Sequence, residues 1–255
     1  STRPGPPPTT HYDTKKWLAP PLPGLAGENA VIIKAGVRVV AAAQPAEAAE
    51  VIRAKAAELG SSLRFVDSPM MRFPIALLGE HQKENAALAI AAFQAAEVSV
   101  SENAIARGLA EVRWPARFQR WDERTVIDGA HNPAGARVLI QAWRATFGVR
   151  KATVILATLA DKDVSAFADA LAPIVRRIFL PRIQSERALS PDELCLTIKG
   201  LLPAVRCAPF PSFSAAWEVA QHAAVPILIP CSLHFARDVL AFLRDQTPAS
   251  HKCIP

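Results

Sequence analysis

The chain has 255 residues, of which 51% are hydrophobic and 20% charged, and its net charge at pH 7 is +6. This balance is typical of a soluble α/β protein, and no apolar run reaches the roughly eighteen residues that a transmembrane helix needs. The four cysteines share no Cys-x-x-Cys spacing, which argues against a zinc site or a redox pair. We expect a protein of a reducing compartment, the cytoplasm or alternatively the mitochondrial matrix, with no membrane partner.

Residues 1–27 are rich in proline, with seven prolines between Pro4 and Pro23. Such a segment cannot bury enough apolar surface to order itself. We predict that it lies extended over a neighbouring domain or another chain.

Residues 28–113 alternate apolar strand patterns with helical ones. The predicted elements are a strand over 31–43 interrupted at Gly36, a helix over 46–59 closed by Gly60, a strand over 63–66, and helices over 80–96 and about 101–112. Residues 114–121 are predicted to be an interdomain linker.

From Arg124 onward, strands and helices alternate regularly. The predicted strands are 125–128, 152–158, 177–180, 204–208 and 226–230, with helices over 133–147, 163–172, 191–199, 213–222 and 233–244. Strands this apolar are typical of a parallel sheet buried on both faces. The fold class is therefore α/β, with a doubly wound, mostly parallel sheet over residues 122–255.

The most informative segment joins the strand ending at Asp128 to the helix starting at Pro133. Asn132 is a favourable N-cap, and proline at the first helical position loses no hydrogen bond. The turn therefore presents Asp128, His131 and free helix amides at the carboxyl end of a strand, where open α/β sheets bind ligands. An ordinary capped turn is the alternative interpretation.

Five further motifs accompany this segment, and they are Gly79-Glu-His-Gln-Lys-Glu-Asn-Ala86, Trp114-Pro-Ala-Arg117, Asp161-Lys-Asp163, Ser185-Glu-Arg-Ala188 and Cys231-Ser-Leu-His234. In order and spacing, the six motifs resemble the folylpolyglutamate synthase/dihydrofolate synthase family, which is related to the Mur ligases. The resemblance covers about residues 26–243. It implies a Rossmann-like C-terminal glutamate-ligase domain preceded by a remnant of the ATPase domain over residues 28–113.

Two departures from the family pattern concern the ATP side. None of the eleven glycines is followed by Lys and then Ser or Thr, so the phosphate-binding loop that the family carries near its N-terminus is missing. The lysine that becomes carbamylated and helps to hold magnesium in many members is Asn29 here. ATP and magnesium are expected for the full-length family enzyme, but we expect neither to bind strongly to this chain alone, and we assign no metal ligand.

The resemblance assigns three residues to ATP. Asn85 would bond the adenine edge, or is a solvent-facing polar residue. Arg117 would clamp a phosphate with its guanidinium fork, or forms an interdomain salt bridge. Asp128 would accept from the ribose hydroxyls, or caps the following turn.

Three residues are assigned to glutamate. His131 would be the catalytic residue, orienting the incoming glutamate or handling a proton, with a structural histidine as the alternative. By the looser Mur ligase analogy, Lys162 and Ser232 would bind glutamate carboxylates.

Two functions follow from this pattern. The chain is the C-terminal part of an ATP-dependent ligase that joins glutamate to folate, inactive alone and completed by a missing ATPase domain or another chain. Alternatively, it is a catalytically degenerate subunit that acts as a scaffold in a larger assembly. RNA contact is the less favoured explanation of the basic charge, because the basic residues are scattered.

Overall fold

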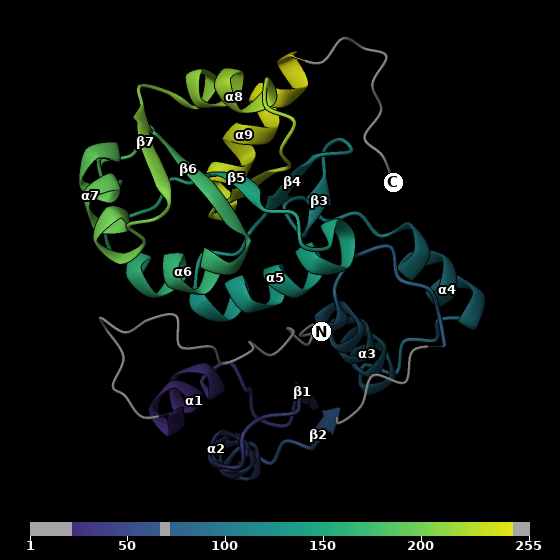
Figure 1. Ribbon diagram of the computed structural model, residues 1–255. Coiled ribbons are helices and arrows are strands. Elements are labelled where there is room, and N and C mark those ends of the chain that lie inside the picture. Colours follow the sequence, from purple (N-terminus) through teal and green to yellow (C-terminus); the bar gives the residue numbers. More distant parts are fainter. Residues whose placement is uncertain (1–21, 67–71, 247–255) are drawn as a thin grey trace. The chain divides into compact units, whose positions relative to one another are not determined.

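The computed structural model describes residues 22–66 and 72–246, which divide into two compact units (Figure 1). Unit 1 contains the residues up to Ala76 together with Glu80–Val112, and unit 2 contains Leu77–Gly79 together with the chain from Arg113 onward. The chain passes from unit 1 to unit 2 between Val112 and Arg113.

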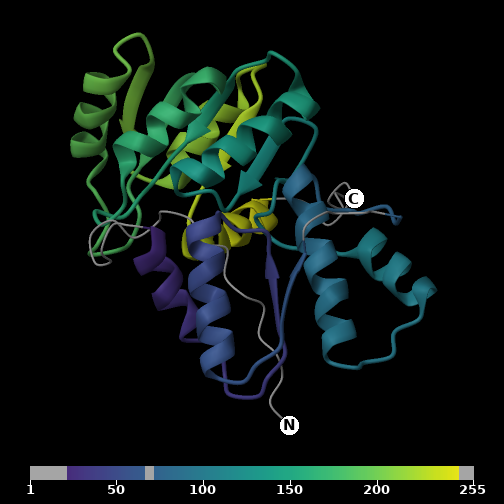
Figure 2. The same ribbon diagram turned by 90° about the horizontal axis from the view of Figure 1, so that it is seen from below.

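Unit 1 is built around a pair of parallel strands. Its elements are α1 (Leu22–Ala30), β1 (Val39–Ala42), α2 (Ala46–Glu58), β2 (Leu63–Val66), α3 (Glu80–Ala95) and α4 (Glu102–Glu111). Helix α2 lies on one side of the strand pair and α3 on the other (Figure 2). The short strand, the three later helices and their order agree with the sequence prediction.

The beginning of unit 1 corrects two predictions. Residues 22–27 are not extended, because they form the first part of α1, which packs on α2 and buries Ala26 and Ala30. Residues 1–21 lie outside the described residues. The strand expected over 31–43 is only Val39–Ala42, because residues before it turn at Gly36, whose φ is +69° and whose amide donates to Leu59 O.

Unit 2 contains a six-stranded sheet in the order β3-β4-β8-β5-β6-β7. Its strands are β3 (Gln119–Arg120), β4 (Thr125–Asp128), β5 (Ala152–Ile155), β6 (Val175–Pro181), β7 (Arg206–Phe210) and β8 (Ile227–Pro230). Every pairing is parallel except that of β3 with β4. The doubly wound, mostly parallel sheet is confirmed.

Helices cover both faces of this sheet (Figure 1). Helices α5 (Pro133–Phe147), α6 (Val164–Leu171) and α7 (Pro191–Leu201) enclose one core, which includes Trp143, and the 3-10 turn η1 (Ala172–Ile174) follows α6. Helices α8 (Phe213–Gln221) and α9 (Leu233–Gln246) enclose a second core, which includes Trp217. Because β4, β5 and β8 each contribute to both cores, their sequences are apolar without alternation.

Residues 114–121 are not a free linker. Ala116 and Phe118 are buried in the cores of unit 2, and Gln119 and Arg120 form the antiparallel edge strand β3. A two-residue strand is too short to give a periodic signal, so the sequence pattern did not predict it.

Trp143 is predicted to be a principal source of stability in unit 2. Its side chain is fully buried, contacts the Phe147 ring in a tilted arrangement at 4.4 Å between ring centroids, and donates from Nε1 to Arg150 O at 2.8 Å. Trp143→Ala should lower the free energy of unfolding by about 3–5 kcal/mol in denaturant titrations. Val149→Ala, at a position 99% exposed, should change it by no more than about 0.5 kcal/mol. Similar losses in both variants would contradict this packing.

Candidate functional site

The turn between β4 and α5 has the predicted capped geometry. Asn132 Oδ1 accepts from the amide of Gly135 at 2.7 Å, and Pro133 occupies the first helical position. A Cβ at Gly135 would lie 3.1 Å from Asn132 Oδ1 and 3.2 Å from Ala130 Cβ, so only glycine fits without displacing the cap. The start of α5 is therefore held tightly against the carboxyl end of β4.

Asp128 ties this turn to the segment before the sheet. Its Oδ2 accepts from the amide of Phe118 at 2.7 Å, and its Oδ1 accepts from the amide of Ala130 at 2.8 Å. Burial raises the pKa of the Asp128 carboxyl above its usual 3.8, against the lowering effects of these two amides and of the nearby charges of Arg117 and His131. Asp128 therefore caps the following turn, which was the alternative interpretation of this residue. Each carboxylate oxygen still has a second lone pair that can accept another hydrogen bond.

Asp128→Asn is predicted to destabilise unit 2, because an amide side chain has one acceptor oxygen for two buried N–H donors. The loss should be about 1–3 kcal/mol in the free energy of unfolding. The folded carboxyl has the higher pKa, so it binds its proton more tightly than the unfolded chain does, and its contribution falls as pH rises through the folded pKa. The gap between wild type and variant should be largest below about pH 3.8. Denaturant titrations across pH would contradict this if the gap widened as pH rose.

Arg117 lies in a strained segment that Asp128 stabilises. Ala116 and Phe118, on either side of it, have φ values of +55° and +45°, a region that side chains other than glycine avoid. The segment is held by hydrogen bonds from Gly129 N to Ala116 O at 2.7 Å and from Ala116 N to Gln119 Oε1 at 3.0 Å. Arg117 itself is exposed, so its guanidinium is accessible to an anion.

A small hollow lies at the carboxyl ends of β4, β8 and β5. His131, Lys162 and Ser232 all line it, and the remaining lining residues are Ala130, Leu156, Ala157, Thr158, Leu159, Val164, Phe167, Ile183, Pro230 and Cys231. Strand β8 lies between β4 and β5, and its helix α9 covers the opposite face from α5 and α6. The hollow thus occupies a topological switch point of the sheet.

Hydrogen bonds hold the side chains of His131 and Ser232 and the backbone of Lys162 in place. His131 Nδ1 lies 2.8 Å from Gly129 O and must donate to it, since a carbonyl can only accept. Ser232 Oγ accepts from the amide of Phe235 at 3.3 Å and so caps α9, which leaves its hydroxyl hydrogen available to an acceptor. The backbone of Lys162 is fixed by Lys162 N donating to Leu159 O and by Val164 N donating to Lys162 O.

The acidic neighbours of Lys162 are both engaged elsewhere. Asp161 Oδ2 pairs with Arg187 Nη2 at 2.8 Å, and Asp163 Oδ1 accepts from Ala166 N at 3.0 Å to cap α6. Within residues 22–66 and 72–246, no carboxylate forms an ion pair with the Lys162 ammonium. At the wall of the hollow, its charge is therefore not compensated by any carboxylate that the structure describes.

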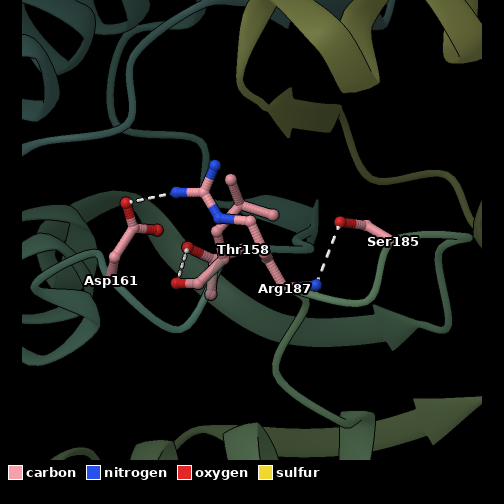
Figure 3. Close-up of polar contacts among 5 residues, drawn as sticks. Thr158, Asp161, Ser185 and Arg187 are labelled. Atoms are coloured by element: carbon pink, nitrogen blue, oxygen red, sulfur yellow. Dashed lines mark hydrogen bonds and ion pairs between the residues drawn. The ribbon is translucent and has the colours of Figure 1, made fainter.

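The loop after β5 is joined to the loop after β6 (Figure 3). Besides the pair between Arg187 and Asp161, Ala160 N donates to Arg187 O and Leu189 N donates to Thr158 O. Ser185 Oγ accepts from Arg187 N at 3.3 Å, which shapes the second loop. These contacts join the loop after β6, which supplies Ile183 to the hollow, to the loop after β5, which supplies Thr158, Leu159 and Lys162.

The remaining predicted residues lie outside the hollow. Asn85 belongs to unit 1, is exposed on α3, and donates from Nδ2 to Gln82 Oε1 at 3.0 Å. Arg117 is not among the lining residues. Sequence reasoning missed Thr158 and Cys231 as lining residues, although both flank predicted strand ends. No group of three His, Cys, Asp or Glu residues suited to a metal occurs in the part of the chain that the structure describes.

The sequence is similar to those of known proteins. Residues 116–228 match the Mur ligase, glutamate ligase domain family. Folylpolyglutamate synthase of Lacticaseibacillus casei is 34% identical over 200 residues, which cover 66% of this chain and 46% of that protein. Dihydrofolate synthase/folylpolyglutamate synthase of Mycobacterium tuberculosis is 37% identical over 127 residues, covering 47% of this chain and 26% of that protein.

The fold agrees with solved structures of the same group. Mycobacterium tuberculosis folylpolyglutamate synthase complexed with ADP and AMPPCP superposes with a TM-score of 0.82 at 27% identity, covering 90% of this chain and 61% of that chain. The chain spans about half the length or less of the curated relatives it matches. No helix in its described part is long and apolar enough to cross a membrane. Residues 116–228 therefore form a Mur ligase glutamate ligase domain, and the chain as a whole is similar in sequence and fold to folylpolyglutamate and dihydrofolate synthases.

Proposed function

We propose that this chain supplies the glutamate-binding part of an ATP-dependent ligase that joins glutamate to folate. The observation that carries the proposal is the convergence of His131, Lys162 and Ser232 on one hollow at the switch point of the sheet. They come from three separate segments of the sequence, after β4, β5 and β8. The names of the relatives, which are synthases of folylpolyglutamate and dihydrofolate, support the same reaction class.

The hollow has the donors that a dicarboxylic amino acid requires. The ammonium of Lys162 and the hydroxyl of Ser232 can each donate to a carboxylate, and a charged donor strengthens such a bond. The amides at the start of α9, which Ser232 caps, favour a negative group at the same place. The apolar residues Leu156, Val164 and Phe167 form walls against the methylene groups.

His131 is proposed as the residue that orients the incoming amine. Its Nδ1–H donates to Gly129 O, so in the neutral imidazole Nε2 is the acceptor nitrogen. An acceptor beside the glutamate amine can take the proton that leaves when nitrogen attacks an activated carboxyl. Asn85, Arg117 and Asp128 remain proposed ATP contacts, with Arg117 the exposed guanidinium suited to a phosphate.

The residues of this chain do not fit magnesium and a triphosphate by themselves. The 255-residue sequence contains no glycine followed by Lys and then Ser or Thr, and Asn29 replaces the lysine of the family pattern. Asn29 carries no charge and cannot become an anionic ligand. The Asn29 departure also supports the second function, a scaffold subunit that keeps the fold without the reaction.

The purified 255-residue chain is predicted not to turn over ATP, because a phosphate-binding loop and an anionic magnesium ligand are both missing from its sequence. Folate-dependent ADP release should equal that of a no-protein control. Release above that background that disappears in His131→Ala would contradict the prediction.

L-Glutamate is predicted to bind the hollow of this chain in the millimolar range, about −4 kcal/mol. His131→Ala, Lys162→Ala and Ser232→Ala should each weaken binding in NMR titrations. Lys151→Ala is the matched control, because this exposed lysine precedes β5, at the strand's other end, and should leave the affinity unchanged. Shifts scattered over the chain, or none, would favour the scaffold function.

A further inference from the structure

Basic residues gather at the amino ends of the parallel strands, the edge opposite the hollow. Lys151 precedes β5, Arg176 and Arg177 begin β6 after Val175, and Arg206 begins β7. These strands are neighbours in the order β5-β6-β7, so the charges lie along one edge of the sheet. The glutamate hollow uses none of these residues.

Two of these arginines stand side by side on one face. Arg177 and Arg206 are direct partners in the parallel pairing of β6 with β7, so their side chains emerge on the same face of the sheet. This is the face that α8 covers, because the Arg177 guanidinium lies 5.0 Å from the centroid of the Phe179 ring, which belongs to the α8–α9 core. Arg176 has no cross-strand partner in β5, because the register of β5 with β6 shifts between Val175 and Arg177. Like charges placed directly opposite each other on neighbouring strands destabilise a sheet.

The two arginines have no countercharge among the described residues. Arg177 Nε donates to Thr153 Oγ1 at 2.9 Å, while its Nη2 is buried and has no hydrogen-bond partner. No Asp or Glu of residues 22–66 and 72–246 forms an ion pair with either guanidinium, including Glu218, the acidic residue of α8. Burial and the charge of Arg176 lower the pKa of Arg177. A buried donor without an acceptor and an uncompensated charge both destabilise the ligand-free protein.

We propose that Arg177 and Arg206 form a binding site for a phosphate group at the amino edge of the sheet. A phosphate brings up to two negative charges and several acceptor oxygens, which match two adjacent guanidinium forks. The exposed Arg206 would bind the phosphate from β7, with the Arg177 guanidinium beside it on the neighbouring strand. Inorganic phosphate and the backbone of a nucleic acid share this chemistry. The site does not depend on glutamate ligation.

The test compares three full-length chains, wild type, Arg206→Gln and Arg176→Gln, in sodium phosphate and in sodium chloride of equal ionic strength. Arg176→Gln is the matched control, because it removes the same charge from the adjacent exposed residue, which is not paired with Arg206. Phosphate should raise the melting temperature of wild type and Arg176→Gln but not of Arg206→Gln. Calorimetric phosphate affinity should fall about tenfold in Arg206→Gln. Without phosphate, Arg206→Gln should be at least as stable as wild type, because the repulsion is relieved.

Equal responses to phosphate in wild type and Arg206→Gln, or equal losses in both variants, would overturn the proposal. If Arg206→Gln does not fold, Arg177→Lys replaces it; this variant keeps the charge, loses the fork, and should also bind phosphate about tenfold more weakly. Unchanged phosphate affinity in Arg177→Lys would refute the site.

Binding of a short single-stranded RNA then distinguishes the two sources of phosphate, the free ion and the nucleic-acid backbone. RNA affinity reduced in Arg206→Gln but not in Arg176→Gln identifies backbone phosphate as the ligand, and RNA affinity equal in both identifies the free ion.

Discussion

The geometry of the candidate site depends on one carboxylate, that of Asp128. Its two oxygens accept the amides of Phe118 and Ala130, and its backbone oxygen accepts the amide of Cys231 at 2.8 Å. One residue thus joins the segment before the sheet, the turn that carries His131, and the end of β8 next to Ser232. Because burial opposes its ionisation while both amides favour it, the carboxylate can be stable there only with these partners in place.

Next to that anchor, no carboxylate in the described part of the chain forms an ion pair with Lys162, so its charge is available to a ligand. In the Asp161-Lys162-Asp163 loop, both acids are occupied, one by Arg187 and the other by the start of α6. The pair between Asp161 and Arg187 is exposed, so it adds little stability. Its effect is geometric, since it joins two loops that would otherwise be separate (Figure 3). The same motif therefore both positions Lys162 and leaves its charge uncompensated.

The sequence predicted most of unit 2 because its signals are local. Strand β4, helix α5 and the Asn132 cap follow from apolar runs and terminal residues that need no tertiary information. The pairing of His131 with Lys162 and Ser232 in one hollow depends on strand order, in which β8 inserts between β4 and β5. Periodicity does not contain that order, and the resemblance to a family supplied the residues instead. The partner of Asp161 is equally non-local, since Arg187 lies on a different loop.

Unit 1 was harder to predict because small residues give ambiguous patterns. Helix α1 contains Gly24 and Gly27, both of which disfavour a helix, yet its buried alanines pack on α2. Apolar residues over 31–38 resembled a strand, but Val31 and Ile32 are exposed. The sequence predicted a buried strand at Arg177, but it did not indicate that another arginine, Arg206, would lie opposite it on the neighbouring strand.

A crystal structure of the full chain with L-glutamate tests the central claim most directly. If the hollow at the ends of β4, β5 and β8 is the glutamate site, the amino acid will lie there, with carboxylate oxygens within hydrogen-bond distance of Lys162 Nζ and Ser232 Oγ and the amine beside the His131 ring. Glutamate bound elsewhere on unit 2, or a hollow that stays empty at concentrations where solution binding is saturated, would contradict the account.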